Sequence, residues 1–347
     1  MRRAASPRHP RPRSRRGRLP DSGLPGHSRL GPWLHLPVDL TAEFEAELHD
    51  IRRPIKTAAG QQERPPPCRI AGSSSVTRVT LQNMPDPAVC FFLGRDGVRL
   101  AYREVGRGRP LVLLHGVAGD GTLWLRYGHA ETIAARGHRV IMPDFRGHGR
   151  SEKPHDAVRC PPDVLADDGL ALLEHLGLDD YDLGGYSLGA RIVVRMLVRG
   201  ATPRRAVVAG QGLHQVLGVG GGAGSFLRRV FAGAGTFEPG SPEEQAEQSL
   251  RANGADPVAL LHVLDSLVAT PVEALGRIRV PALVVLGTDD ERAVSADELV
   301  AALPHGTRAV VPGNHGTAAG TPELTAAILD FLADPQPPVR RTGAVPE

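Results

Sequence analysis

Short apolar segments alternate with longer amphipathic segments from residue 91 onward, and this alternation limits the fold more than any other feature. Runs of β-branched, alanine and leucine residues are typical of strands buried on both faces of a sheet. They occur at 111–114, 140–142, 183–186, 206–209, 282–286 and 308–311. An earlier pair, 91–93 and 98–105, flanks a Gly-Arg-Asp-Gly turn at 94–97 that favours a hairpin.

Helical patterns fill the spaces between these segments. Leu324, Ala327, Ile328 and Phe331 recur at helical spacing after Pro322, and residues 164–176 form an apolar face that ends at Gly177. Buried strands that alternate with amphipathic helices predict an α/β fold, a mostly parallel doubly wound sheet with helices on both faces.

One segment interrupts the alternation. Residues 213–279 begin with a glycine-rich stretch at 218–224 and continue into helical patterns around 243–253 and 258–267. We interpret this segment as a small helical cap, or lid, that divides the core into residues 84–212 and 280–335. Residues 336–347 are predicted to be a disordered tail.

Residues 1–83 differ in composition from the rest of the chain. They hold 15 Lys and Arg against 7 Asp and Glu, which leaves +8 on this segment and −5 on residues 84–347. With 11 prolines and little apolar periodicity, they are predicted to be a disordered tail outside the working enzyme, with Met84 as a possible separate start. A transit peptide, or a tail that docks on nucleic acid or an anionic membrane, is the alternative.

Charge and composition exclude several classes. The mildly acidic body gives no support for nucleic-acid binding, and no apolar run is long enough to span a membrane, so we expect neither partner. The cysteines are Cys68, Cys90 and Cys160, too few and too scattered for a disulfide framework or a zinc site. A cytoplasmic protein without metal or cofactor is predicted, and its oligomeric state is left open.

The pentapeptide Gly-Tyr-Ser-Leu-Gly at 185–189 follows a buried-strand segment directly and begins a helical one, 188–198. A tight strand-to-helix turn would project Ser187 outward, and small residues at 185 and 189 would let the backbone bend that sharply. This setting predicts a serine nucleophile. The motif alone, without the flanking elements, is weak.

Residues 91–333 resemble the α/β-hydrolase family, in its esterase and lactonase-like branch. The resemblance rests on five motifs in order: Leu-His-Gly at 114–116, Asp-Phe-Arg-Gly-His-Gly-Arg-Ser at 144–151, the pentapeptide at 185–189, Gly-Thr-Asp-Asp at 287–290 and Gly-Asn-His at 313–315. It implies a nucleophile, an acid and a histidine in that order along the chain. The serine disfavours the epoxide-hydrolase and dehalogenase branches, which use a carboxylate nucleophile.

A serine hydroxyl needs a base to take its proton and an acid to orient that base. The resemblance assigns these roles to His315 and Asp290, with Asp289 as the alternative acid. It also assigns the oxyanion hole to the backbone amides of Val117 and Leu188.

Other conspicuous residues receive structural interpretations. His115 is expected to shape a turn, with direct catalysis as the alternative, and Asp144, Arg146 and His148 are expected to shape a loop rather than hold a metal. Trp124 and Tyr186 are predicted to contact the substrate, although core packing competes as an interpretation for Trp124.

These residues predict a serine hydrolase that cleaves a carboxylic ester, lactone or thioester of a small molecule through an acyl-enzyme. A cofactor-free perhydrolase of the haloperoxidase type and a carbon–carbon bond hydrolase remain alternatives on the same triad. A non-catalytic module that binds a small ligand is the alternative from another class.

Overall fold

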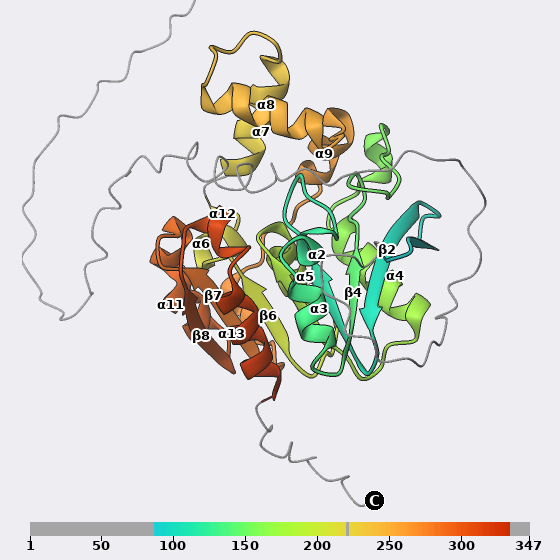
Figure 1. Ribbon diagram of the computed structural model, residues 1–347, viewed down its shortest axis with the longest axis vertical. Coiled ribbons are helices and arrows are strands. Elements are labelled where there is room, and N and C mark those ends of the chain that lie inside the picture. Colours follow the sequence, from blue (N-terminus) through green and yellow to red (C-terminus); the bar gives the residue numbers. More distant parts are fainter. Residues whose placement is uncertain (1–86, 220–221, 334–347) are drawn as a thin grey trace, which may run out of the picture. The chain divides into compact units, whose positions relative to one another are not determined.

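The computed structural model describes residues 87–219 and 222–333, and these residues build one eight-stranded sheet (Figure 1). The strand order is β1-β2-β4-β3-β5-β6-β7-β8. Only the pairs β1–β2 and β2–β4 are antiparallel. The strands are β1 (Cys90–Leu93), β2 (Arg99–Gly106), β3 (Arg109–Leu114), β4 (His138–Pro143), β5 (Asp182–Tyr186), β6 (Ala206–Ala209), β7 (Ala282–Gly287) and β8 (Gly306–Val311).

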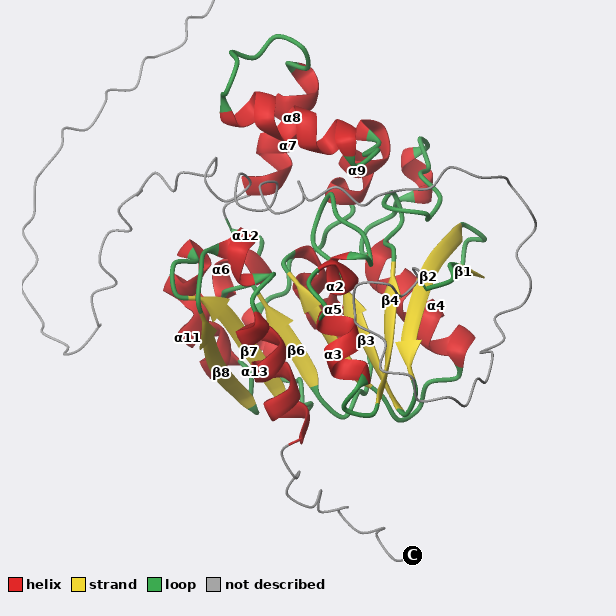
Figure 2. Ribbon diagram, viewed as in Figure 1, coloured by secondary structure: helices red, strands yellow, loops and turns green. Residues whose placement is uncertain are grey.

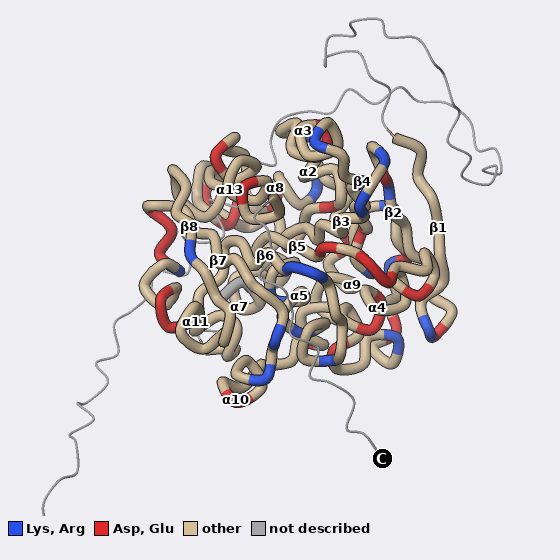
Figure 3. Tube along the Cα trace, turned by 90° about the horizontal axis from the view of Figure 1, so that it is seen from below, with Lys and Arg blue, Asp and Glu red and all other residues tan. Residues whose placement is uncertain are grey.

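Helices cover both faces of this sheet (Figures 2 and 3). One face carries α4 (Val164–Leu176), α5 (Leu188–Val198) and α11 (Ala296–Ala302), and the other carries α2 (Leu123–Arg126), α3 (His129–Ala134) and α13 (Pro322–Ala333). The buried apolar side chains accordingly form two clusters. The predicted α/β fold is confirmed.

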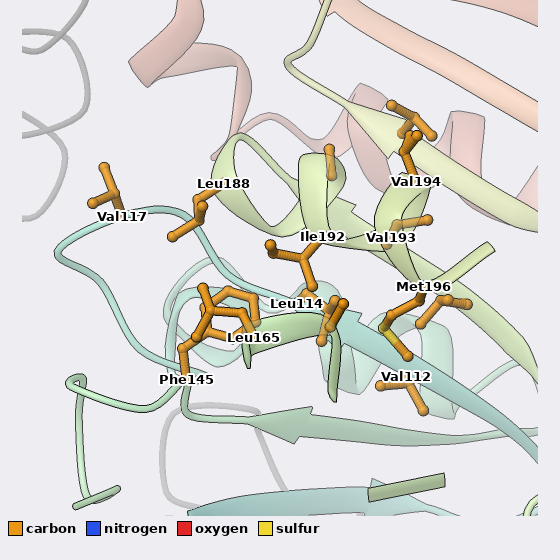
Figure 4. Packing of buried hydrophobic residues seen from close by; sticks show 14 of the residues in the cluster. Val112, Leu114, Val117, Phe145, Leu165, Leu188, Ile192, Val193, Val194 and Met196 are labelled. Carbon is orange, nitrogen blue, oxygen red and sulfur yellow. The ribbon is translucent and has the colours of Figure 1, made fainter. Parts of the chain in front are cut away.

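The packing around α5 shows how the core holds this arrangement (Figure 4). Val112 and Leu114 of β3 lie in one cluster with Ile192 and Met196 of α5, and each side chain is at most 2% exposed. Burying an aliphatic side chain of this size contributes about 1.5–3 kcal/mol. At Gly169 of α4, an added Cβ would lie 2.6 Å from the Met196 sulfur, so the Met196 side chain would have to move to admit a larger residue there.

Between residues 213 and 279 the described part of the chain is helical. It forms α6 (Leu213–Val216), α7 (Gly222–Ala232), α8 (Pro242–Ala252), α9 (Pro257–Asp265) and α10 (Val272–Leu275), and α7 packs on both α8 and α9. His155 Nε2 lies 2.7 Å from Asp256 Oδ2, and Asp163 N donates to Ser266 O at 2.7 Å, so α9 is tied to the core at both of its ends. The predicted domain limits stay a prediction.

The elements match the sequence pattern closely. Every expected strand forms with ends that differ by two residues or fewer, the 94–97 turn joins an antiparallel hairpin, and α4 ends at Gly177 in the left-handed conformation (φ 59°). The two predicted tails, 1–83 and 336–347, lie outside the described residues. In residues 87–219 and 222–333, no helix combines the length and apolarity needed to cross a membrane.

Candidate active site

Three predicted residues lie after carboxyl ends of parallel strands. Ser187 connects β5 to α5, Asp290 follows β7, and His315 begins α12 (His315–Ala318) after β8. Their side chains are buried, with 4%, 4% and 2% of each residue exposed. Because β5 and β7 both pair with β6, and β7 pairs with β8, residues more than a hundred positions apart reach the same edge of the sheet.

The turn at Ser187 has the geometry of a strained strand-to-helix bend. Ser187 has φ 54° and ψ −116°, and it is one of few non-glycine residues with positive φ in the described part of the chain. A Cβ added at Gly185 would lie 2.4 Å from the Gly189 carbonyl carbon, and one added at Gly189 would lie 2.3 Å from Leu114 O. Glycine is therefore required at both positions by backbone atoms that have no room to move.

His315 and Asp290 form a buried hydrogen-bonded pair. His315 Nδ1 lies 3.0 Å from Asp290 Oδ2, and Asp290 Oδ1 accepts from the Arg292 amide at 3.0 Å. An ionised carboxylate only accepts, so His315 carries its proton on Nδ1 and presents Nε2 as the basic nitrogen. Of the two candidate acids, Asp290 contacts His315, whereas Asp289 is exposed.

The pKa of Asp290 lies below its ordinary value. Burial opposes its ionisation, but the hydrogen bond from His315 and the charges of His315 and Arg292 outweigh that effect. Asp290 is therefore ionised at neutral pH and can stabilise positive charge on the imidazole of His315.

The two predicted oxyanion donors lie in loops that Gly189 brings together. Leu188 is the first residue of α5, so its amide has no partner one turn earlier within the helix. Val117 follows β3, and Gly189 packs against Leu114 O and the neighbouring carbonyl of His115 at that strand end. Both residues are at most 6% exposed.

His115 shapes this loop through two hydrogen bonds. Its Nδ1 lies 2.7 Å from Gly116 O, and its Nε2 accepts from the Phe145 amide at 3.0 Å. Burial lowers the pKa of His115 to about 4. A neutral imidazole with both nitrogens engaged serves as a spacer between two loops, as expected from the sequence.

The cluster at 144–148 is also built for structure. Asp144 accepts from Arg103 at 3.2 Å and from the amides of Gly121 and Arg150 at 2.9 and 2.8 Å. Arg146, 1% exposed at its side chain, binds Asp168 and Asp96 at 2.7 and 2.6 Å. Among the residues that the structure describes, no group of three or more His, Cys, Asp or Glu is placed to hold a metal.

Comparison with known proteins identifies the family. A model described as "alpha/beta hydrolase fold" matches residues 109–209, which include β3, the turn at Ser187 and β6. The described part of the chain has the fold of the α/β-hydrolase family. Solved structures of α/β hydrolases agree: an esterase from Rhodococcus sp. is 26% identical with a TM-score of 0.57, and the match covers 70% of this chain and 98% of that one.

Curated relatives of this α/β hydrolase match over shorter segments. A 2-hydroxymuconate semialdehyde hydrolase from Pseudomonas sp. is 33% identical over 122 residues, which is 34% of this chain and 41% of the relative. A non-heme chloroperoxidase from Kitasatospora aureofaciens is 36% identical over 110 residues, 32% of this chain and 38% of the relative. The chain thus spans about two-fifths of the length of these relatives.

A pocket of about 490 Å³ opens beside His315. Its wall includes His315, Tyr186 and Val117, and it continues along Leu123, Arg126 and Tyr127 of the segment that contains α2. Ser187 is not part of this wall, so of the three predicted catalytic residues the pocket reaches His315.

Trp124 is a buried residue of the core. It is 1% exposed, belongs to the core cluster under α3 and α13, and its ring lies 5.9 Å from that of His129. Trp124 is not among the residues that line this pocket, so its contact with substrate stays a prediction. One turn of helix directs Trp124 inward, whereas its neighbours Leu123 and Tyr127 line the pocket.

Two features of the site were not predicted from sequence. Tyr186 lines the pocket as expected, but its hydroxyl also donates to the His315 carbonyl at 2.5 Å, and the two rings lie 5.3 Å apart. Arg126 lines the same pocket. Position 126 falls in the helical segment after the His-Gly motif, and this location was the only signal in the sequence that could have drawn attention to it.

Proposed function

We propose that this α/β hydrolase cleaves a carboxylic ester, lactone or thioester of a small molecule through an acyl-enzyme on Ser187. The buried contact between His315 Nδ1 and Asp290 Oδ2 is the observation that carries the proposal. It orients the imidazole at the same edge of the sheet at which the strained turn presents Ser187.

The proposed reaction runs in two halves. His315 Nε2 takes the proton of the Ser187 hydroxyl while its oxygen attacks the substrate carbonyl, and the carbonyl electron pair moves onto oxygen. The amides of Val117 and Leu188 stabilise that oxyanion. When the carbonyl reforms, the bond to the alcohol or thiol breaks, and this leaving group receives the proton from His315.

Water completes the second half. His315 takes a proton from the water that attacks the acyl carbon, and the proton passes to Ser187 as the ester bond to the enzyme breaks. Asp290, ionised through the proposed cycle, stabilises the imidazolium that forms in each half. Removing one oxyanion donor from such a site typically costs about 10²–10³ in kcat.

A perhydrolase or a carbon–carbon bond hydrolase is a second candidate on the same residues. The similarity to proteins described as a 2-hydroxymuconate semialdehyde hydrolase and a chloroperoxidase favours this alternative. Peroxide-dependent bromination that is faster than ester hydrolysis would favour a perhydrolase. Cleavage of a dienone ring-fission product with no ester turnover would favour a carbon–carbon bond hydrolase.

Labelling with a fluorophosphonate tests the proposed nucleophile. The wild-type chain should be labelled at Ser187 and should hydrolyse p-nitrophenyl esters of graded chain length. Ser187→Ala should lose the label and lower kcat by about 10³–10⁶. Because the alanine removes only one oxygen, thermal unfolding should change little. Labelling at another residue, or an active protein that is not labelled, would contradict the proposal.

A further inference from the structure

Arg126 is an uncompensated cation in the wall of the pocket. It ends α2 and lines the pocket together with His315 and Val117. No hydrogen bond or ion pair joins its guanidinium to another residue in the described part of the chain, and its Nε is buried without a hydrogen-bond partner.

Three arginines with buried side chains are each paired with a carboxylate. Arg103 pairs with Asp144 at 3.2 Å, Arg146 pairs with Asp168 at 2.7 Å, and Arg195 pairs with Asp163 at 2.5 Å. Each of these three arginines forms an ion pair with a carboxylate and stabilises the fold. A buried N–H of a charged group without an acceptor costs free energy. The Nε of Arg191 is also buried without a hydrogen-bond partner, so what distinguishes Arg126 is that it lines the pocket.

Asp120, the acidic residue of the same pocket, does not provide the missing partner. Its Oδ1 accepts from the Thr122 amide at 2.8 Å and from the Thr122 hydroxyl at 2.5 Å. Burial opposes its ionisation, but these hydrogen bonds and the charge of Arg103 hold its pKa below the ordinary value. The Asp120 carboxylate is thus hydrogen-bonded within the loop that follows β3. Among the described contacts, it forms no ion pair with Arg126.

The position of Arg126 in the pocket indicates which ligand group could pair with its guanidinium. The pocket connects Arg126 to Val117 and His315, the groups proposed to act on the scissile carbonyl. A planar guanidinium matches a carboxylate in a bidentate geometry. A substrate that spans the pocket can therefore place an ester carbonyl at one end and a carboxylate at the other.

We infer that the substrate is an ester or lactone whose acyl part carries a free carboxylate, and that Arg126 binds this carboxylate. The inference rests on the proposed function and names its substrate class. The half-ester of a short dicarboxylic acid is such a substrate.

The test compares two activated esters of similar length. Mono-p-nitrophenyl glutarate carries the carboxylate, and p-nitrophenyl pentanoate does not. We measure the ratio of kcat/KM for the charged ester to kcat/KM for the neutral one, because this ratio does not depend on the fraction of folded enzyme. Arg126→Gln should lower the ratio by about 10–100-fold, the range expected for a charged hydrogen bond.

Two further variants separate charge from position. Arg126→Lys keeps the charge but loses the bidentate geometry, so its ratio should lie between those of the wild type and Arg126→Gln. Arg136→Gln removes an exposed arginine near the end of α3, changes the net charge equally, and should leave the ratio unchanged. An unchanged ratio in Arg126→Gln, or an equal fall in Arg136→Gln, would overturn the inference.

Protection of Ser187 gives a second measurement that needs only the wild-type chain. Glutarate should slow fluorophosphonate labelling of Ser187 at concentrations at which neutral pentanamide does not. Equal protection by both compounds would overturn the inference even if Arg126→Gln failed to fold. Absence of both labelling and ester turnover would instead contradict the proposed function, so the two failures are distinguishable.

Discussion

Two buried aspartates at opposite ends of the same sheet have opposite pKa shifts. Asp290, after β7, lies at the carboxyl edge with the candidate nucleophile, and Asp182 begins β5 at the amino edge. They are 4% and 1% exposed. The pKa of Asp290 is lowered, whereas burial raises the pKa of Asp182 to about 6.

The partners of each carboxylate explain the difference. Asp290 accepts from His315 and from the Arg292 amide. Among the residues that the structure describes, neither oxygen of Asp182 has a hydrogen-bond partner, and the Arg109 guanidinium approaches only to 3.9 Å. Burial acts in the same direction on both, so the hydrogen-bonded partners decide which carboxylate stays ionised. Asp290 therefore stays ionised because of its hydrogen-bonded partners, which Asp182 lacks among the described residues.

The largest effect should separate the two aspartates in catalysis. Asp290→Asn should lower kcat by about 10³–10⁴, because an amide that donates to His315 Nδ1 favours the wrong tautomer and cannot stabilise the imidazolium. Asp182→Asn, the same substitution at the other edge, should leave kcat within about twofold. Steady-state hydrolysis of a p-nitrophenyl ester measures both. A comparable loss in the two variants would remove the functional distinction between the edges.

The carboxyl edge should also be the less tolerant of added volume. In Gly189→Ala the new methyl would meet the Leu114 backbone at 2.3 Å, so we expect the free energy of unfolding to fall by about 2–3 kcal/mol and activity to drop with it. Gly224→Ala in α7 meets nothing within 4 Å and should be neutral or stabilise by up to about 1 kcal/mol. Urea unfolding measures both, and equal stability of the two variants would contradict the packing account.

The sequence predicts most of this fold because its signals are local. The apolar segment at 206–209 and the helix at 188–198 form with the predicted bounds. Each needs only its own residues and a sheet to pack against. The order of the motifs likewise predicts that Ser187 and His315 reach one edge, because parallel strands share their carboxyl ends.

What the sequence leaves open depends on side-chain direction and on contacts between distant residues. The choice between Asp289 and Asp290 required the contact with His315 across 25 positions. Trp124 and Tyr127 lie three positions apart on one short segment, yet one is core and the other lines the pocket. No periodicity within four residues distinguishes these outcomes, and the lack of a partner at Arg126 is visible only when all neighbours are placed.

Stability should depend on pH in opposite directions at the two aspartates. Since the folded pKa of Asp182 is raised to about 6 from 3.8, the native state gains stability from this group below pH 4 and loses it as pH rises through about 6. The free energy of unfolding of Asp182→Asn, relative to that of wild type, should therefore rise by about 1–3 kcal/mol between pH 4 and pH 8.

Asp290→Asn is the matched control for that measurement. The lowered pKa of Asp290 stabilises the folded state above pH 4, so the variant should be less stable than wild type at pH 8, and the deficit should shrink only as the pH falls below 4. Buried His115 and His148 titrate in all three proteins and cancel in the difference. Urea unfolding at several pH values would refute this account if both variants followed wild type in parallel.

The smallest effect compares two tyrosines at the ends of β5. Tyr186 donates its hydroxyl to the His315 carbonyl, so Tyr186→Phe keeps the ring against the imidazole and removes one anchor of the histidine backbone. We expect kcat to fall about 3–10-fold, the range of one net hydrogen bond, and the rate of fluorophosphonate labelling to fall by a similar factor. Tyr181, just before β5, is also buried but lies at the amino edge, so Tyr181→Phe should leave both rates unchanged. If Tyr186→Phe altered thermal stability as Tyr181→Phe does but left the labelling rate at the wild-type value, Tyr186 would be a packing residue and the positioning of His315 would depend on Asp290 alone.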